Sequence, residues 1–239
     1  MFQDLKGKRI LVIGAKSGIG AALSKHLVDF GCLVDGTCRQ KPDQSICSGN
    51  INGSVFVVDF DDSASWAELL ASETIYDGIC VVAGRLKLVP GHMITPNISE
   101  QLITQGLASP IALIASLMKK KKVQRGGSLI FTSSVSRTRP TTSSALYAAC
   151  KAGLVAAAKC LAIDWERKKI RVNCVSFDYV KTPMTENIEE MGEEEIVGVA
   201  EADDVVCSYL FLLSDKSRWM TKSVLAMDAG RKLGKAMHV

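Results

Sequence analysis

The feature of this sequence that most restricts its fold is a regular alternation of short apolar runs with longer segments of helical pattern. Most of the short runs are nearly continuous in apolar residues, which is typical of strands buried on both faces. We predict strands at Arg9–Ile13, Leu33–Cys38, Val55–Asp59, Gly78–Val82, Leu129–Ser133, Arg171–Ser176 and Val224–Met227. Strands that alternate with helices need crossover connections, so the sequence predicts an α/β fold with a doubly wound parallel sheet.

The segments between these runs have the spacing of helices. We predict helices at Ile19–Phe30, Ser63–Ser72, Ser99–Lys120, Ser144–Arg167 and Ala202–Leu213. No linker or repeat divides the 239 residues, so residues 1–239 are expected to form a single domain. Two segments are irregular. Gln40–Gly53 is predicted to turn over the surface, and the glutamate-rich Lys181–Ala200 is interpreted either as a substrate lid or as a solvated acidic helix.

The composition excludes several classes of protein. Apolar residues make up 47% and charged residues 23% of the chain, which argues against intrinsic disorder. The net charge of +4 does not imply a nucleic-acid or membrane surface, and Lys119–Lys122 follows a helix end, where cations complement the helix dipole. The eight cysteines form no Cys-x-x-Cys pair and the three histidines are scattered, so no metal site is expected. With no export signal and no apolar stretch of membrane-spanning length, we expect a soluble cytoplasmic protein with no nucleic-acid or membrane partner.

A glycine-rich turn lies between the first predicted strand and the first predicted helix. It contains Gly14, Lys16, Ser17, Gly18 and Gly20 in the spacing Gly-x-x-x-Gly-x-Gly. Glycines let the backbone turn sharply and approach a ligand, and the exposed amides at a helix start attract a pyrophosphate. The turn therefore predicts a dinucleotide site, with tight packing as the alternative explanation.

The residues at the end of the second predicted strand indicate which dinucleotide, NAD(H) or NADP(H), the site would bind. An acidic residue there would bind a ribose 2′-hydroxyl and select NAD(H), but the sequence has Cys38 followed by Arg39. A guanidinium pairs well with a 2′-phosphate, and Lys16 supplies a second cation. NADP(H) is therefore favoured, although Asp35 in the same strand keeps NAD(H) as a lesser alternative.

Three polar residues in the second half of the chain have the chemistry of a proton-transfer site. Tyr147 and Lys151 are four residues apart on a predicted helix and therefore share one face. A nearby cation favours a phenolate, so we expect Lys151 to lower the pKa of Tyr147. Ser134 ends a buried strand shortly before, where a hydroxyl could hydrogen-bond a substrate oxygen.

Taken together and in order, these motifs resemble the classical short-chain dehydrogenase/reductase family over almost the whole chain. The glycine turn, Asp59, Ala83-Gly84, the trio Ser134, Tyr147 and Lys151, the segment from Arg171 to Ser176, Thr182-Pro183-Met184 and Asp228-Ala229-Gly230 carry the resemblance. It implies a Rossmann-type NAD(P)-binding domain and hydride transfer between a nicotinamide and a carbonyl or alcohol carbon.

The resemblance also implies a role for each of these residues. Tyr147 would be the proton donor or acceptor, Lys151 would lower the pKa of Tyr147 and hold the nicotinamide ribose, and Ser134 would polarise the substrate oxygen. Further cofactor contacts are implied for Ile19, Asp59, Phe60, Ala83, Gly84, Val180 and Thr182. A homodimer or homotetramer is implied by the apolar faces of Ser99–Lys120 and Ser144–Arg167.

Several positions depart from the family pattern. Val81 and Val82 replace two asparagines, Phe177-Asp178 replaces a Pro-Gly pair, and Gly106 stands where a fourth catalytic residue, an asparagine, is usual. Gln105 could take over from that missing side chain. The departures keep open a second function, a nucleotide-binding sensor or scaffold with little catalysis. A sugar-nucleotide epimerase or dehydratase is disfavoured, because those enzymes need a further C-terminal substrate domain. For the first function, a 3-oxoacyl reductase-like activity is one option among several carbonyl substrates.

Overall fold

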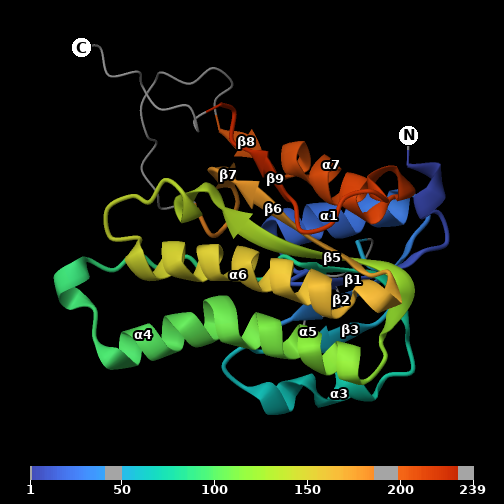
Figure 1. Cartoon of the computed structure of the whole chain (residues 1–239), viewed down its shortest axis with the longest axis horizontal. Helices are drawn as coiled ribbons and strands as arrows, with labels where there is room; N and C mark the ends of the chain where they lie inside the picture. The colour runs from blue at the N-terminus through green and yellow to red at the C-terminus, as the bar shows by residue number, and fades with distance from the viewer. Residues whose placement is uncertain (1, 41–49, 186–198, 231–239) are drawn as a thin grey trace.

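A computed structural model describes residues 2–40, 50–185 and 199–230. Its centre is a seven-stranded sheet in the order β3-β2-β1-β4-β5-β6-β9, with every neighbouring pair parallel (Figure 1). The strands are β1 (Arg9–Ile13), β2 (Leu33–Cys38), β3 (Val55–Val57), β4 (Tyr76–Val81), β5 (Val123–Ser134), β6 (Arg171–Phe177) and β9 (Val224–Met227). The predicted α/β fold with a doubly wound sheet is therefore confirmed.

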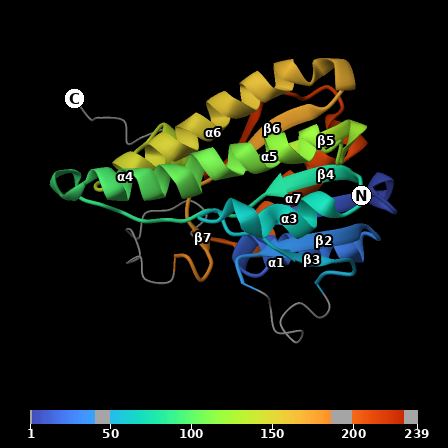
Figure 2. The same ribbon diagram turned by 90° about the horizontal axis from the view of Figure 1, so that it is seen from below.

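Helices cover both faces of the sheet. On one face lie α1 (Gly18–Asp29) and α7 (Ala202–Leu213), and on the other lie α3 (Ala67–Ala71), α4 (Pro96–Ile103), α5 (Ser109–Lys119) and α6 (Ala145–Asp164) (Figure 1). Figure 2 looks onto the face covered by α3 to α6. Short 3₁₀ turns occur at Gln3–Leu5, Ser63–Trp66, Gly91–Met93, Val135–Arg137, Glu166–Lys168 and Asp215–Ser217. The predicted helix over Ser63–Ser72 thus divides into a 3₁₀ turn and the short α3.

Two apolar cores follow from this layering. Successive residues of β1 point to opposite faces, so Leu11 and Ile13 enter the core under α5 and α6, while Ile10 and Val12 enter the core under α1 and α7. All four side chains are almost completely buried. Burial on both faces explains why the strands appear in the sequence as continuous apolar runs rather than as alternating ones.

The helix predicted over Ser99–Lys120 is interrupted. Between α4 and α5, residues Thr104–Ala108 form a π-helical turn. The start of α4 is capped by Thr95, whose hydroxyl accepts a hydrogen bond from the amide of Ile98, and Pro96 occupies the first turn. A π-helical turn inserts one residue into the helical repeat and frequently occurs at functional sites.

A second sheet of two strands lies beyond β6. In it β7 (Val180–Lys181) pairs in parallel with β8 (Ala200–Glu201), and Lys181 forms an ion pair of 3.1 Å with Glu201. The predicted lid over residues 181–200 and the predicted surface turn over residues 40–53 lie partly outside the described residues.

Two helical stretches satisfy the length and composition of a membrane span, Pro96–Lys119 and Ala145–Asp164. Core helices of water-soluble proteins satisfy the same criteria. Leu113 and Leu117 of the first stretch and Leu154 of the second pack into the core described above.

Candidate active site

The carboxyl ends of the parallel strands open into a cleft of about 520 Å³. Such edges are where ligands bind in open α/β sheets. The cleft brings together all but one of the site residues predicted from sequence. Its lining includes Gly14, Lys16, Ser17, Gly18, Ile19, Arg39, Asp59, Phe60, Ala83, Gly84, Ser134, Tyr147, Lys151, Val180 and Thr182.

The exception is Gly20, which is not in the lining but packs against the backbone of the glycine turn. A Cβ atom on Gly20 would clash with the carbonyl oxygen of Gly14. Gly14 itself has a φ of +93°, and a Cβ there would lie 2.7 Å from the backbone nitrogen of Ala83. Gly14 and Gly20 are therefore required by backbone packing, and Gly14 in addition lines the cleft.

The start of α1 faces the cleft. The helix begins at Gly18, and the side chain of Ser17 at its N-cap accepts no capping hydrogen bond. A Cβ on Gly18 would lie 3.0 Å from Cγ2 of Thr182, so the glycine keeps a narrow space open between the turn and the segment after β7. Helix amides beside such a space fit a pyrophosphate.

The two cations predicted to bind a 2′-phosphate, Lys16 and Arg39, are exposed and line the cleft. Asp35, the residue that kept NAD(H) as an alternative, is only 2% exposed and is absent from the lining. Its carboxylate accepts hydrogen bonds from the Tyr76 hydroxyl at 2.9 Å and from the Ser54 amide at 2.7 Å. Asp35 is thus committed to holding β2 and the segment before β3, and it is not placed to bind a ribose.

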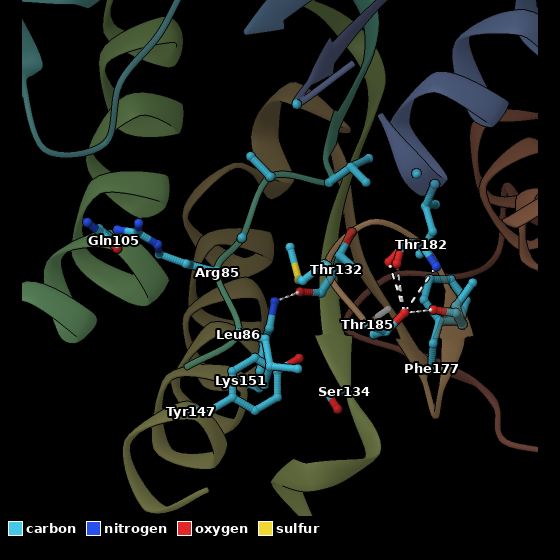
Figure 3. Close-up of a pocket in the computed structure, with 18 of the residues that line it drawn as sticks. Arg85, Leu86, Gln105, Thr132, Ser134, Tyr147, Lys151, Phe177, Thr182 and Thr185 are labelled. Atoms are coloured by element: carbon cyan, nitrogen blue, oxygen red, sulfur yellow. Dashed lines mark hydrogen bonds between the residues drawn. The ribbon is translucent and has the colours of Figure 1, made fainter. Parts of the chain in front are cut away.

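Ser134, Tyr147 and Lys151 also line the cleft, and Figure 3 shows them together. Ser134 is the last residue of β5, and its hydroxyl accepts a hydrogen bond from the amide of Ser136 at 3.2 Å. Tyr147 and Lys151 project from adjacent turns of α6. Burial raises the pKa of the Tyr147 phenol, and a hydrogen bond with the Ser134 side chain partly offsets that effect.

The ammonium of Lys151 has a different environment from the one expected. Its Nζ donates to the carbonyl oxygen of Thr132 at 2.9 Å and lies 5.7 Å from the centre of the Tyr147 ring. Burial lowers the pKa of Lys151 to about 8. The expected lowering of the Tyr147 pKa by Lys151 is not what this structure has, because burial of the phenol outweighs the other influences on it.

The positions that depart from the family pattern have local explanations. Gly106 lies in the π-helical turn against α6, and a Cβ there would be 3.0 Å from both Cβ and Sγ of Cys150, so the position has little room for a side chain. Near Val81 and Val82, the hydroxyl of Thr132 links β5 to β4 by donating to the Val81 carbonyl at 2.8 Å. That hydroxyl is also 2.6 Å from the Tyr209 hydroxyl on α7.

Several residues of the cleft were not predicted from the sequence. Leu86, Leu88, Tyr179 and Met184 give part of the lining an apolar character, and Arg85, Arg139 and Thr185 are also in the lining. Thr185 fixes the segment after β7, since its hydroxyl donates to the Val180 carbonyl at 2.7 Å and accepts from the Thr182 amide at 3.0 Å. These residues lie in irregular turns, which have no hydrophobic period to reveal them.

Within the described part of the chain, no three His, Cys, Asp or Glu side chains are grouped so that they could hold a metal ion. His26 instead pairs with Asp203, linking α1 to α7 at 3.0 Å. The seven cysteines that the structure describes are free thiols.

A family model described as enoyl-(acyl carrier protein) reductase matches residues 14–232. Among curated proteins, L-xylulose reductase from Caenorhabditis elegans is 30% identical over 244 residues, which cover 95% of this chain and 96% of the relative. A tropinone reductase homolog from Arabidopsis thaliana is 27% identical over 95% of this chain and 93% of its own length. The 3-oxoacyl-(acyl-carrier-protein) reductase of Salmonella typhimurium is 26% identical over 95% and 98%.

Solved structures share the fold. A short chain dehydrogenase/reductase family protein superposes with a TM-score of 0.88 at 24% identity, covering 96% of this chain and 99% of the other. A short chain dehydrogenase from Burkholderia cenocepacia, solved in complex with NADP, gives a TM-score of 0.87 at 24% identity, with coverages of 96% and 99%. A 3-ketoacyl-(acyl-carrier-protein) reductase from Brucella melitensis, complexed with NADH, gives 0.84 at 22% identity, with coverages of 95% and 99%.

Proposed function

The chain belongs to the short-chain dehydrogenase/reductase family, and we propose that it is an NADP(H)-dependent oxidoreductase acting on a carbonyl or alcohol substrate. The observation that carries this proposal is the convergence of Ser134, Tyr147 and Lys151 in the same cleft as the glycine turn. A proton donor and a dinucleotide cradle in one cavity are what hydride transfer to a carbonyl requires.

The fit of a dinucleotide rests on the shape of the cleft. Glycine keeps the space between Gly18 and Thr182 open, and the N-terminus of α1 offers backbone amides for a pyrophosphate. Val180 and Thr182 lie beside that space, where they would contact a carboxamide. When bound, the nicotinamide supplies or accepts the hydride.

Residues of the chain would orient the substrate oxygen and supply its proton. The Ser134 hydroxyl, at the end of β5, would donate a hydrogen bond to the carbonyl oxygen and so hold it beside the Tyr147 hydroxyl. Because burial keeps the Tyr147 phenol protonated around neutral pH, it would donate its proton to that oxygen during reduction. Lys151, fixed by the Thr132 carbonyl, would hold the nicotinamide ribose and place positive charge near the phenol.

The preference for NADP(H) over NAD(H) follows from charge. Lys16 and Arg39 are exposed cations on the cleft wall, and the one acidic residue inside β2, Asp35, is buried and already bonded. A 2′-phosphate would meet two cations at this place, whereas a 2′-hydroxyl would meet no free carboxylate of β2. Solved relatives bind NADP and NADPH, and one binds NADH.

For the substrate we propose a small molecule whose carbonyl carries an apolar substituent. The same cleft that contains Tyr147 is lined by the apolar residues Leu86, Leu88 and Met184, with Arg139 exposed in the lining. Ketoacyl, tropinone and xylulose are named among the relatives' substrates, so an apolar 3-oxoacyl chain and a sugar ketone are the first compounds to compare.

The direct test is NADPH consumption over a panel of ketones, followed by Tyr147→Phe on the best substrate. Removing the phenolic proton should lower kcat by about 10²–10⁴-fold. Binding of NADPH, followed by its fluorescence, should stay within about threefold. Full turnover by Tyr147→Phe would remove Tyr147 from its assigned role.

A second candidate is a nucleotide-binding sensor or scaffold with little catalysis. It is favoured by Gly106, which places no polar side chain against α6 at the position where the family resemblance implies an asparagine. Tight NADPH binding without turnover on the whole ketone panel would select this function, and robust turnover would eliminate it.

We also propose that the chain acts as one NAD(P)-binding domain in the cytoplasm and assembles as a homodimer or homotetramer. The apolar surface of α6 supports assembly, since Ile163 is 60% exposed on it and Cys160 is exposed one turn before. Light scattering measured together with size-exclusion chromatography would give the number of copies, and a monomer at micromolar concentration would contradict this proposal.

A further inference from the structure

Gln105 forms a buried bridge between two turns that are far apart in the sequence. Its side chain is in the π-helical turn and the residue is only 5% exposed. Its Nε2 donates to the Asp61 carboxylate at 2.5 Å, and its Oε1 accepts from the Arg85 guanidinium at 3.3 Å. Figure 3 shows the side chains of Gln105 and Arg85 pointing toward each other.

The two partners demand opposite chemistry. An ionised carboxylate only accepts hydrogen bonds, and a guanidinium only donates them. A primary amide can donate from its nitrogen and accept at its oxygen at the same time, so glutamine satisfies both ends. Glutamate at this position would repel Asp61, and an apolar residue would form neither hydrogen bond, which would leave the exposed Asp61 and Arg85 side chains to water.

The bridge joins the turn after β3 to the turn after β4. Asp61 and Arg85 both line the cleft. A second hydrogen bond holds the turn that contains Asp61 against the same helical segment: the Ser109 hydroxyl, at the start of α5, donates to the Phe60 carbonyl at 2.6 Å. Gly84, which directly precedes Arg85, lies against Lys151, because a Cβ on Gly84 would be 3.3 Å from the Lys151 Nζ. Gln105 therefore connects one end of the cleft with the part that contains the proton donor.

We propose that Gln105 is a positioning residue that couples the two ends of the cleft, so that the turn after β3 and the turn after β4 keep a fixed separation. The inference rests on the proposed function, in which a dinucleotide and a carbonyl share the cleft, and on the family resemblance, which implies that Asp59 and Phe60 contact the dinucleotide. Gln105 touches no reacting atom. It would set how tightly dinucleotide and carbonyl are held, and would leave the proton transfer itself unchanged.

The π-helical turn explains how the side chain reaches this place. One extra residue in a helix rotates the following side chains by about 100° relative to those before it. The insertion lets Leu102 of α4 and Leu113 of α5 both remain buried while Gln105 points at the strand ends. Gly106 permits the close approach of this turn to Cys150 on α6.

The experiment compares Gln105→Met, which keeps the length of the side chain and removes both polar atoms, with Gln101→Met. Gln101 lies about one turn earlier on α4 and is exposed, so it controls for the change of residue. The dissociation constant of NADPH and, with an accepted ketone, KM and kcat are measured for each. We expect Gln105→Met to raise the NADPH dissociation constant and the ketone KM by about 3- to 10-fold, with kcat within about twofold. Gln101→Met should change none of them. A fall in kcat alone, or unchanged binding, would overturn the proposal.

A double-mutant cycle separates coupling from simple loss of stability. Asp61→Asn and Arg85→Met are made singly and together, once with Gln105 present and once with Gln105→Met. With Gln105, the combined effect on the NADPH dissociation constant should differ from the product of the single effects by about threefold or more, and with Gln105→Met the effects should multiply. Simple multiplication in both backgrounds would overturn the proposal.

The same cycle measured by urea unfolding needs no ligand and no turnover. If neither NADPH nor NADH binds, the proposed function fails, and the urea cycle alone decides whether Gln105 couples Asp61 to Arg85. A coupling that persists in the Gln105→Met background would show that the two turns are held together by something else.

Discussion

The ammonium of Lys151 and the ring of Tyr147 lie 5.7 Å apart on one face of α6, yet the ammonium donates its hydrogen bond to the carbonyl of Thr132 and not to the phenol. The helix therefore fixes the spacing of the pair, and β5 fixes the orientation of the cation. Lys151 is buried and Tyr147 is half-buried, and desolvation raises the pKa of Tyr147 while it lowers the pKa of Lys151. Desolvation disfavours the charged form of each group. The charged form of tyrosine is the deprotonated phenolate and that of lysine is the protonated ammonium, so the two pKa values move in opposite directions.

The raised pKa of Tyr147 predicts different pH profiles for the two reaction directions. Carbonyl reduction uses the protonated phenol, which persists through neutral pH, so its kcat/KM should be flat between about pH 6 and 7.5. Alcohol oxidation uses the phenolate, so its rate should rise by about tenfold per pH unit over the same range. Steady-state rates in both directions provide the measurement. An oxidation rate that peaks at or below pH 7 would contradict the raised pKa.

Replacement of Lys151 by methionine should stabilise the protein at pH 7. An unfolded lysine has a pKa of 10.5, and burial lowers the folded value to about 8. Below pH 8 both states are protonated and the full penalty for burying the charge applies. Between pH 8 and 10.5 the unfolded state binds more protons, so wild-type stability rises with pH there. Lys151→Met lacks this penalty and should be more stable by ~1–3 kcal/mol at pH 7.

Urea unfolding at several pH values gives the measurement for Lys151→Met. The difference from the wild type should shrink as the pH rises from 8 to 10.5. A difference that stays constant over this range would mean that Lys151 has an ordinary pKa in the folded state.

Arg39 should determine most of the preference between the two dinucleotides. Arg39→Gln removes a charge-assisted contact with a 2′-phosphate, so the dissociation constant of NADPH should rise by about tenfold. The dissociation constant of NADH should stay within about twofold, since it has no such phosphate. Arg218→Gln is the matched control, because Arg218 is exposed but is not part of the cleft lining. Equal weakening of NADPH and NADH would show that Arg39 acts on the fold and not on the phosphate.

Gly20 should tolerate no side chain, although it does not line the cleft. A Cβ on Gly20 would clash with the Gly14 carbonyl, so Gly20→Ala should lower the free energy of unfolding by ~1–3 kcal/mol and weaken dinucleotide binding by displacing the turn. Gly91→Ala is the control, since a Cβ on Gly91 meets nothing within 4 Å. Chemical unfolding and NADPH titration of both variants test this. Similar stabilities for the two variants would contradict the assigned packing role of Gly20.

The fold could be predicted because its signals are local. Each strand is buried on both faces, so apolar runs such as Ile10–Ile13 appear plainly in the sequence. The start of β5 could not be predicted in this way, because Gln124, Arg125, Gly126 and Gly127 have no apolar pattern and lie between Val123 and Ser128, where the register with β4 shifts. The π-helical turn at Thr104–Ala108 was not predicted either.

The site was predictable where spacing along the chain determines the geometry. Tyr147 and Lys151 share a helix face by sequence alone, and Gly14, Gly18 and Gly20 mark the turn after β1 and the start of α1. Burial and contacts between distant turns were not predictable. The sequence could not reveal that Asp35 is bonded to Tyr76, that burial dominates the pKa of Tyr147, or that Gln105 joins Asp61 to Arg85.

The cleft takes its residues from turns that follow separate strands of one sheet, and this arrangement has an evolutionary consequence. Leu86 and Met184 lie in such turns, outside the strand end that holds Ser134 and the helix that holds Tyr147 and Lys151. Mutations in these turns can therefore change which compounds fit the cleft and leave the arrangement of Ser134, Tyr147 and Lys151 unchanged. Proteins with this fold can therefore evolve toward new substrates through substitutions in single turns, without change in the residues proposed to transfer the proton.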